Sequence, residues 1–266
     1  MNSFLTKEES NFIKGVAIIL MLFHHLFAFP DKIGNHDILY IFPQFFTRNL
    51  SLISAVCVPM FLFISGYGMS FTKTKKFRYY FSKVLKLYSM LWLLMVIFLP
   101  IMFFMDHSLL LGSNTVVVIL NIFAIKSDWV GEWWFVSLYS FLILVTPILF
   151  KIKKIGLLTV LSLGLIFVPG TIPYTSIIIS KLPAFLIGFY VGLNQKSIIE
   201  YVNKVLNSWL ALILLVLIFL SVPIFLNLIF NVSLSSQSFV IFPFIIVLKK
   251  VYSILNGWPK IKKHYL

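Results

Sequence analysis

The sequence predicts an all-α fold, a polytopic bundle of about eight transmembrane helices with both termini in the cytoplasm. Three observations lead to this prediction. First, 60% of the 266 residues are hydrophobic and only 11% are charged, which leaves too little polar surface for a water-soluble domain of this size. Second, several apolar runs exceed the roughly 18 residues that a helix needs to cross hydrocarbon. Third, the 22 basic residues are distributed unevenly among the segments that join these runs.

The expected spans follow from hydropathy in chain order. They lie near residues 11–29, 50–71, 84–105, 133–150, 155–172, 177–193, 207–229 and 237–255. Each is predicted to be a helix, because a spanning segment must satisfy its own backbone and these runs are too long for barrel strands. The apolar stretch 115–125 is too short to cross, so it is predicted to be an interfacial or re-entrant element. The spans form one integral membrane domain, residues 1–266, because no linker or repeat divides them.

The basic residues predict the orientation of the bundle. If 115–125 does not cross, all of them lie on one side except Lys32, Arg48, Lys126 and Lys181. The positive-inside rule then places that side in the cytoplasm. The net charge of +14 is thereby interpreted as a topology signal, and no recognition motif supports nucleic-acid binding. The abundance of lysine over arginine suits an AT-rich bacterial genome, which favours the bacterial cytoplasmic membrane as the location.

Three ionisable groups interrupt the first apolar run, "NFIKGVAIILMLFHHLF". On a helix, Lys14 and His25 are about three turns and about 16 Å apart on one face, and His24 is rotated away by about 80°. Lys14 is either a snorkelling anchor or a functional cation. A histidine at the depth of His25 is costly unless it faces the bundle interior or a wet cavity. It is therefore either a hydrogen-bonded bridge between helices, a general base or a proton carrier.

Five motifs occur in order along the chain. Lys14 precedes His25 by ten intervening positions, and Ser65, Gly66 and Tyr67 end the apolar run "VPMFLFISGYGMSF". The basic segment "FRYYFSKVLKLYSMLW", the aromatic stretch "GEWWFVSLYSFLILVTPIL" and the helix "KLPAFLIGFYVGL" follow. In this order they resemble the acyltransferase 3 family of integral membrane acyltransferases, of the envelope glycan O-acetyltransferase type. The resemblance covers about residues 11–193.

The resemblance implies a membrane-bound O-acyltransferase that transfers an acyl group, usually acetyl from acetyl-CoA, to a hydroxyl of an envelope carbohydrate or its lipid-linked precursor. The catalytic residues expected are His25, Lys14 and Glu132. His25 would deprotonate the acceptor hydroxyl or receive the acyl group transiently, and Lys14 would orient the donor. Glu132, beside two tryptophans, would orient a histidine or a sugar; alternatively it is an interfacial residue of an aromatic belt.

Two sets of binding residues complete this prediction. The cations expected to bind acetyl-CoA are Lys75, Lys76, Arg78, Lys83 and Lys86, which suit phosphate groups and cation–π contact with adenine. Alternatively this segment is a topology determinant that contacts anionic lipid. The residues expected to bind the acceptor are His24, Ser65, Tyr67, Trp134 and Tyr139. No metal is expected, because ligands do not occur at metal-binding spacing and Cys57 is the single cysteine.

Other functions and some departures from the family pattern stay open. The chief alternative is a proton-coupled transporter or flippase of a small or lipid-linked substrate, and a membrane scaffold is a further one. Paired helix interruptions at matching positions, which would indicate inverted repeats, are not found.

Lys14 replaces the commoner arginine of the family and loses its bidentate fork. Members of the family generally continue into further C-terminal helices, so the chain is expected to lack the family's last helices, and either a helix pair is dispensable or the chain is truncated. Gly188 and Gly192 have the spacing that lets two membrane helices approach closely, although such pairs also occur by chance.

Overall fold

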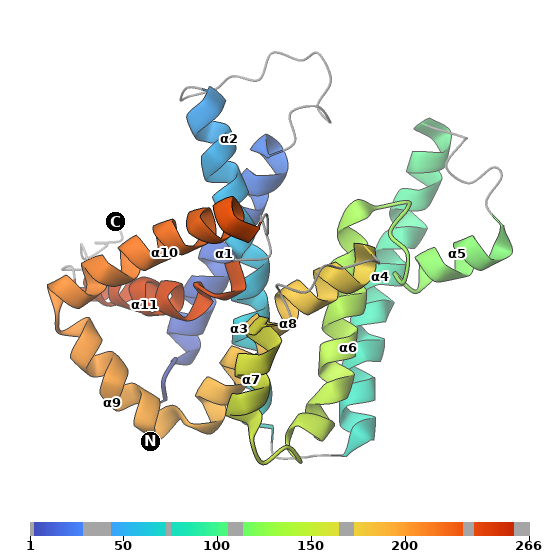
Figure 1. Cartoon of the computed structure of the whole chain (residues 1–266). Helices are drawn as coiled ribbons and strands as arrows, with labels where there is room; N and C mark the ends of the chain where they lie inside the picture. The colour runs from blue at the N-terminus through green and yellow to red at the C-terminus, as the bar shows by residue number, and fades with distance from the viewer. Residues whose placement is uncertain are drawn as a thin grey trace, which may run out of the picture. The chain divides into compact units, whose positions relative to one another are not determined.

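The structure, a computed structural model, describes residues 3–28, 44–72, 76–105, 114–164, 173–230 and 237–257 (Figure 1). The regular secondary structure of these ranges is entirely helical, which confirms the predicted all-α fold. Within them, four segments are long and apolar enough to cross a membrane: Lys7–Phe27, Phe46–Ser70, Phe77–Ile101 and Gly131–Leu149. They coincide with the first four predicted spans. A fifth candidate, Gln195–Leu206 with Trp209–Val222, is bent by 103°. The total of about eight spans and the cytoplasmic termini remain predictions.

The chain divides into two compact units. The first unit is Met1–Phe71 with Lys154–Leu266, and the second is Thr72–Lys153. The first unit contains α1 (Lys7–Phe27), α2 (Gln44–Ile53), the 3-10 turn η2 (Ser54–Val56), α3 (Cys57–Ser70), α7 (Ile155–Gly164), α8 (Pro173–Leu193), α9 (Gln195–Leu206), α10 (Trp209–Phe230) and α11 (Ile241–Gly257). The second unit contains α4 (Phe77–Met105), α5 (Thr115–Ile122), the 3-10 turn η4 (Gly131–Trp133) and α6 (Trp134–Leu149).

The backbones of α3 and α8 touch in the core of the first unit. A Cβ added to Gly66 would overlap the carbonyl oxygen of Phe185, and one added to Gly188 would overlap that of Phe63. Gly192 lies equally close to the last turn of α3. The close approach expected from the spacing of Gly188 and Gly192 is therefore present. At Gly66 and Gly188 the two backbones meet with no side chain between them, whereas at Gly192 the neighbour is the Ser70 side chain.

This contact predicts a contrast between two glycines of α3. Gly66→Ala is expected to destabilise the first unit by about 1–3 kcal/mol, because the new methyl group would meet backbone atoms that cannot move independently. Gly68→Ala is the matched control, since a Cβ there has no neighbour within 4 Å. Alanine is the better helix former, so this control is expected to leave stability unchanged or raise it. Thermal unfolding in detergent measures both, and equal unfolding temperatures would contradict the contact.

The second unit is organised around Asn121, at the end of α5, whose side chain is completely buried. Its Oδ1 accepts hydrogen bonds from the backbone amides of Asp128 and Trp129, at 2.9 and 3.3 Å. Its Nδ2 donates to the carbonyl of Val117 and to the Asp128 carboxylate, at 2.9 and 3.2 Å. These four bonds fold the chain back after α5. At eight residues α5 is too short to span a membrane, as predicted for 115–125.

The charge count assigned Lys181 to the outer side of the membrane, within the predicted span 177–193. In the structure this residue lies eight positions inside α8, about 12 Å along the helix from Pro173. Its side chain is only 7% exposed. The apolar neighbours that follow it, Ala184 and Phe185, are completely buried. Lys181 is therefore a buried cation within a helix and no guide to topology.

Candidate functional site

The two adjacent histidines of α1 lie in different environments. His24 is 9% exposed, and its Nδ1 lies 2.8 Å from the carbonyl oxygen of Ser51 in α2. A carbonyl only accepts, so the proton of a neutral His24 ring is on Nδ1 and Nε2 is the acceptor. The carbonyl is accessible because α2 gives way to the 3-10 turn η2, which interrupts the regular helical hydrogen-bond pattern. His24 is thus held in one orientation and one tautomer.

His25 lies on an adjacent, exposed face of α1 within the first unit. Lys14 is also exposed, as the eleven-residue spacing requires of a residue on the same face. The ring centroids of His24 and His25 are 5.5 Å apart, with the planes at 69°. Two imidazoles are therefore in edge-to-face contact, one fixed in the interior and one presented at the surface.

A layer of polar groups extends inward from His24. Gln237, before α11, donates from Nε2 to the carbonyl of Leu52, the residue after the carbonyl that binds His24. Ser238 donates from Oγ to the carbonyl of Ser180, at 2.7 Å. Lys181 follows Ser180 on α8 and lies within electrostatic range of His24. Four elements, α1, α2, α8 and the segment before α11, thus contribute to one layer of the first unit.

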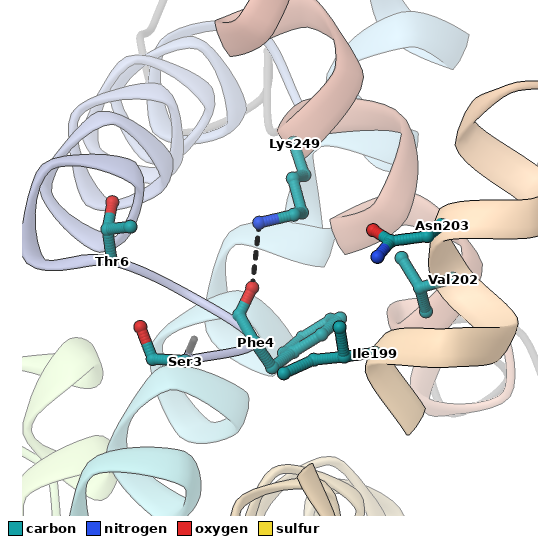
Figure 2. Close-up of a pocket in the computed structure, with 7 residues that line it drawn as sticks. All are labelled: Ser3, Phe4, Thr6, Ile199, Val202, Asn203 and Lys249. Carbon is teal, nitrogen blue, oxygen red and sulfur yellow. Dashed lines mark hydrogen bonds between the residues drawn. The ribbon is translucent and has the colours of Figure 1, made fainter. Parts of the chain in front are cut away.

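A cavity of about 340 Å³ lies at the other end of α1, shown in Figure 2. The residues that line it come from the N-terminal segment, α9 and α11, and are Ser3, Phe4, Thr6, Ile199, Val202, Asn203 and Lys249. Lys249 donates to the carbonyl of Phe4 at 2.8 Å, as the dashed line in Figure 2 marks, and also to Glu9. Tyr67, expected to bind the acceptor, accepts a bond from the amide of Leu5 at 3.0 Å. Its hydroxyl therefore anchors the N-terminal segment.

The remaining predicted residues have these positions. Ser65, on α3 in the first unit, is partly buried. In the second unit, Lys76, Arg78 and Lys86 are exposed around the start of α4, and the Lys83 ammonium lies 5.0 Å from the centre of the Tyr79 ring. Glu132 is exposed in η4, Trp134 begins α6 and Tyr139 stacks on Phe135 with the centroids 5.8 Å apart. Lys75 lies outside the described residues.

Comparison with protein families decides the class of the molecule. Residues 8–259 match the model of a family whose description is acyltransferase domain. The chain belongs to the acyltransferase 3 family. No curated protein and no solved structure matches it. The match continues beyond residue 193, where the resemblance of the motifs ended, so α9, α10 and α11 belong to the acyltransferase domain as well.

Sequence reasoning about this acyltransferase missed Lys181 and Gln237. The signal for Lys181 was present, because a lysine inside an apolar run long enough to span is functional by default. The charge count used Lys181 only as a topology signal on the outer side of the membrane. Gln237 had no comparable signal, since a glutamine at the start of a predicted span is common. Its burial depends on contacts with α2, 185 positions away in the sequence.

Proposed function

We propose that this acyltransferase transfers acetyl from acetyl-CoA to a hydroxyl of an envelope carbohydrate or of its lipid-linked precursor, in the bacterial cytoplasmic membrane. Membership of the family supplies the reaction class. The observation that carries the proposal is the histidine pair of α1, an exposed His25 in contact with a fixed His24. Imidazole is the side chain best suited to take a proton from a hydroxyl near neutral pH.

His25 acts as the general base in this proposal. It takes the proton of the acceptor hydroxyl while the hydroxyl oxygen attacks the thioester carbonyl carbon. The carbon–sulfur bond then breaks, the ester forms, and the imidazolium returns its proton to the sulfur of CoA. A two-step route, in which His25 first carries the acetyl group, balances equally and gives the same products.

Charged groups of both units have supporting roles in the proposal. Lys14, on the same face as His25 and three turns away, orients the acyl donor. Lys76, Arg78 and Lys86 are exposed cations around the start of α4 and suit the phosphate groups of CoA. Glu132 orients the sugar or a histidine. Carboxylates of this kind commonly fix a hydroxyl or an imidazole by accepting a hydrogen bond.

The test uses membranes that contain the wild-type chain and matched membranes that lack it. Both are incubated with acetyl-CoA that carries ¹⁴C in the acetyl group, and the glycan fraction is analysed for alkali-labile label. Label is expected only where the chain is present. The absence of label would contradict the proposal. Movement of a lipid-linked glycan across the membrane without acetyl-CoA would favour the transporter instead.

A further inference from the structure

We propose that Lys181 and Gln237, together with His24, form a binding site for a hydroxyl of the acceptor glycan other than the one that His25 deprotonates. The inference rests on the proposed function and adds two residues to its site. It follows from three features of the first unit: a buried cation, the meeting of four elements in the layer that contains this cation, and a buried acceptor atom that needs a donor.

The buried cation is Lys181. It is 7% exposed on α8, a helix whose neighbouring residues Ala184 and Phe185 are completely buried. Burying an ammonium group in a membrane protein is unfavourable, and such groups usually line substrate or ion pathways. The glycine contacts between α3 and α8 fix the backbone that carries it. Lys181 is thus a cation held at a defined place in the interior.

Hydrogen bonds to backbone carbonyls show that the four elements meet in one layer. His24 and Gln237 bond to consecutive carbonyls of α2, those of Ser51 and Leu52. Ser238, next to Gln237, bonds to the carbonyl of Ser180, next to Lys181. The three proposed side chains are therefore brought to one layer by hydrogen bonds between residues far apart in the sequence.

The buried acceptor is Oε1 of Gln237. The side chain is 5% exposed, and among the described residues no group donates a hydrogen bond to Oε1, although Nε2 of the same amide is bonded. Buried polar atoms are nearly always paired, and an unpaired one needs an explanation such as a bound ligand. A ligand that donates a hydrogen bond would satisfy it.

A hydroxyl group has the chemistry that these residues require. It donates one hydrogen bond, which suits Oε1 of Gln237, and it accepts from an ammonium group such as that of Lys181. A carboxylate or a phosphodiester has no proton to donate to Gln237 at neutral pH. The site therefore fits a carbohydrate hydroxyl better than either of these anions. All three side chains are at least nine-tenths buried, so the layer must open for the acceptor to enter.

The first experiment measures initial rates of acetyl transfer to glycan extracted from the same membranes, over a hundredfold range of glycan. Lys181→Met and Gln237→Met remove the polar atoms at nearly constant volume. Each is expected to raise the KM for glycan about tenfold or more and to leave the KM for acetyl-CoA unchanged. Thr159→Val, a buried polar-to-apolar change in α7 of the same unit, is the matched control. It is expected to leave the KM for glycan unchanged.

The unfolding temperature distinguishes a role of Gln237 in binding from a purely structural role. Gln237→Met removes the unpaired buried acceptor Oε1, which favours the folded state, and the bond from Nε2 to the Leu52 carbonyl, which opposes it, so its unfolding temperature is expected to stay close to that of the wild type. A structural role predicts the opposite pair of results, a lower unfolding temperature with an unchanged KM for glycan. That pair would overturn the inference.

The second experiment does not depend on catalysis. The extracted glycan is added to detergent-solubilised His25→Ala protein, which lacks the proposed base, and the rise in unfolding temperature reports binding. Adding Lys181→Met to this variant is expected to abolish the rise. An equal rise with and without Lys181, or no rise in any variant, would overturn the inference. If the wild type transfers no label while the rise depends on Lys181, the proposed function fails and the binding site stands.

Discussion

Membranes that carry His25→Ala are expected to transfer acetyl from acetyl-CoA to glycan about 10²–10⁴-fold more slowly than membranes with the wild type, which is the usual contribution of a general acid–base group. The rate is expected to fall while the amount of protein in the membrane stays the same. His25 is exposed within the first unit, so its replacement leaves the interior of that unit intact. Initial rates of ¹⁴C incorporation, normalised to the amount of protein in the membrane, measure the effect.

Neighbouring residues of α1 provide the controls. Leu26→Ala replaces an exposed side chain, 56% accessible, at the next position, and is expected to retain wild-type activity. His24→Ala removes the bond to the Ser51 carbonyl from a buried position, so both stability and the affinity for glycan should fall. Wild-type rates in His25→Ala would remove this residue from the mechanism. A loss of transfer activity in His24→Ala but not in His25→Ala would assign the role of general base to His24.

The helices were predictable because hydropathy and length determine them. The first four predicted spans coincide with helices of sufficient length and apolarity. Helical geometry alone also placed Lys14 and His25 on one face and His24 on another. Glycine spacing correctly indicated the close approach of α8, but its partner could not be identified, because Gly66 has no comparable glycine spacing within α3.

The environment of each site residue was not predictable from periodicity. Spacing indicates which residues share a face, but it does not say which face is buried. The structure buries His24 and exposes His25, because α1 packs through Ile13 and Ala17, which lie on the face of His24. Tyr67 likewise matched a motif, yet its hydroxyl bonds to the backbone of Leu5, far away in the sequence. Long-range contacts decide such assignments.

Lys249→Met is expected to destabilise the first unit by about 3–5 kcal/mol, because it leaves a buried carboxylate without its partner. The Lys249 ammonium lies 2.7 Å from Oε1 of Glu9, and the two side chains are 16% and 11% exposed. The same ammonium bonds to the Phe4 carbonyl and lies 5.8 Å from the centre of the Phe4 ring. Its loss therefore also weakens the attachment of the N-terminal segment to α11, which the contact of the Phe4 and Phe242 rings still maintains.

The double variant Glu9→Gln with Lys249→Met isolates the charge. It removes both members of the ion pair, so no buried charge is left uncompensated, and it is expected to recover much of the stability lost in Lys249→Met. The Glu9→Gln change also retains a side-chain oxygen that can accept the capping bond from the backbone amide of Thr6, which Glu9 accepts in the wild type. Thermal unfolding of the wild type, both single variants and the double variant gives the coupling energy. Additive losses would show that Lys249 stabilises the fold through Phe4 and not through Glu9.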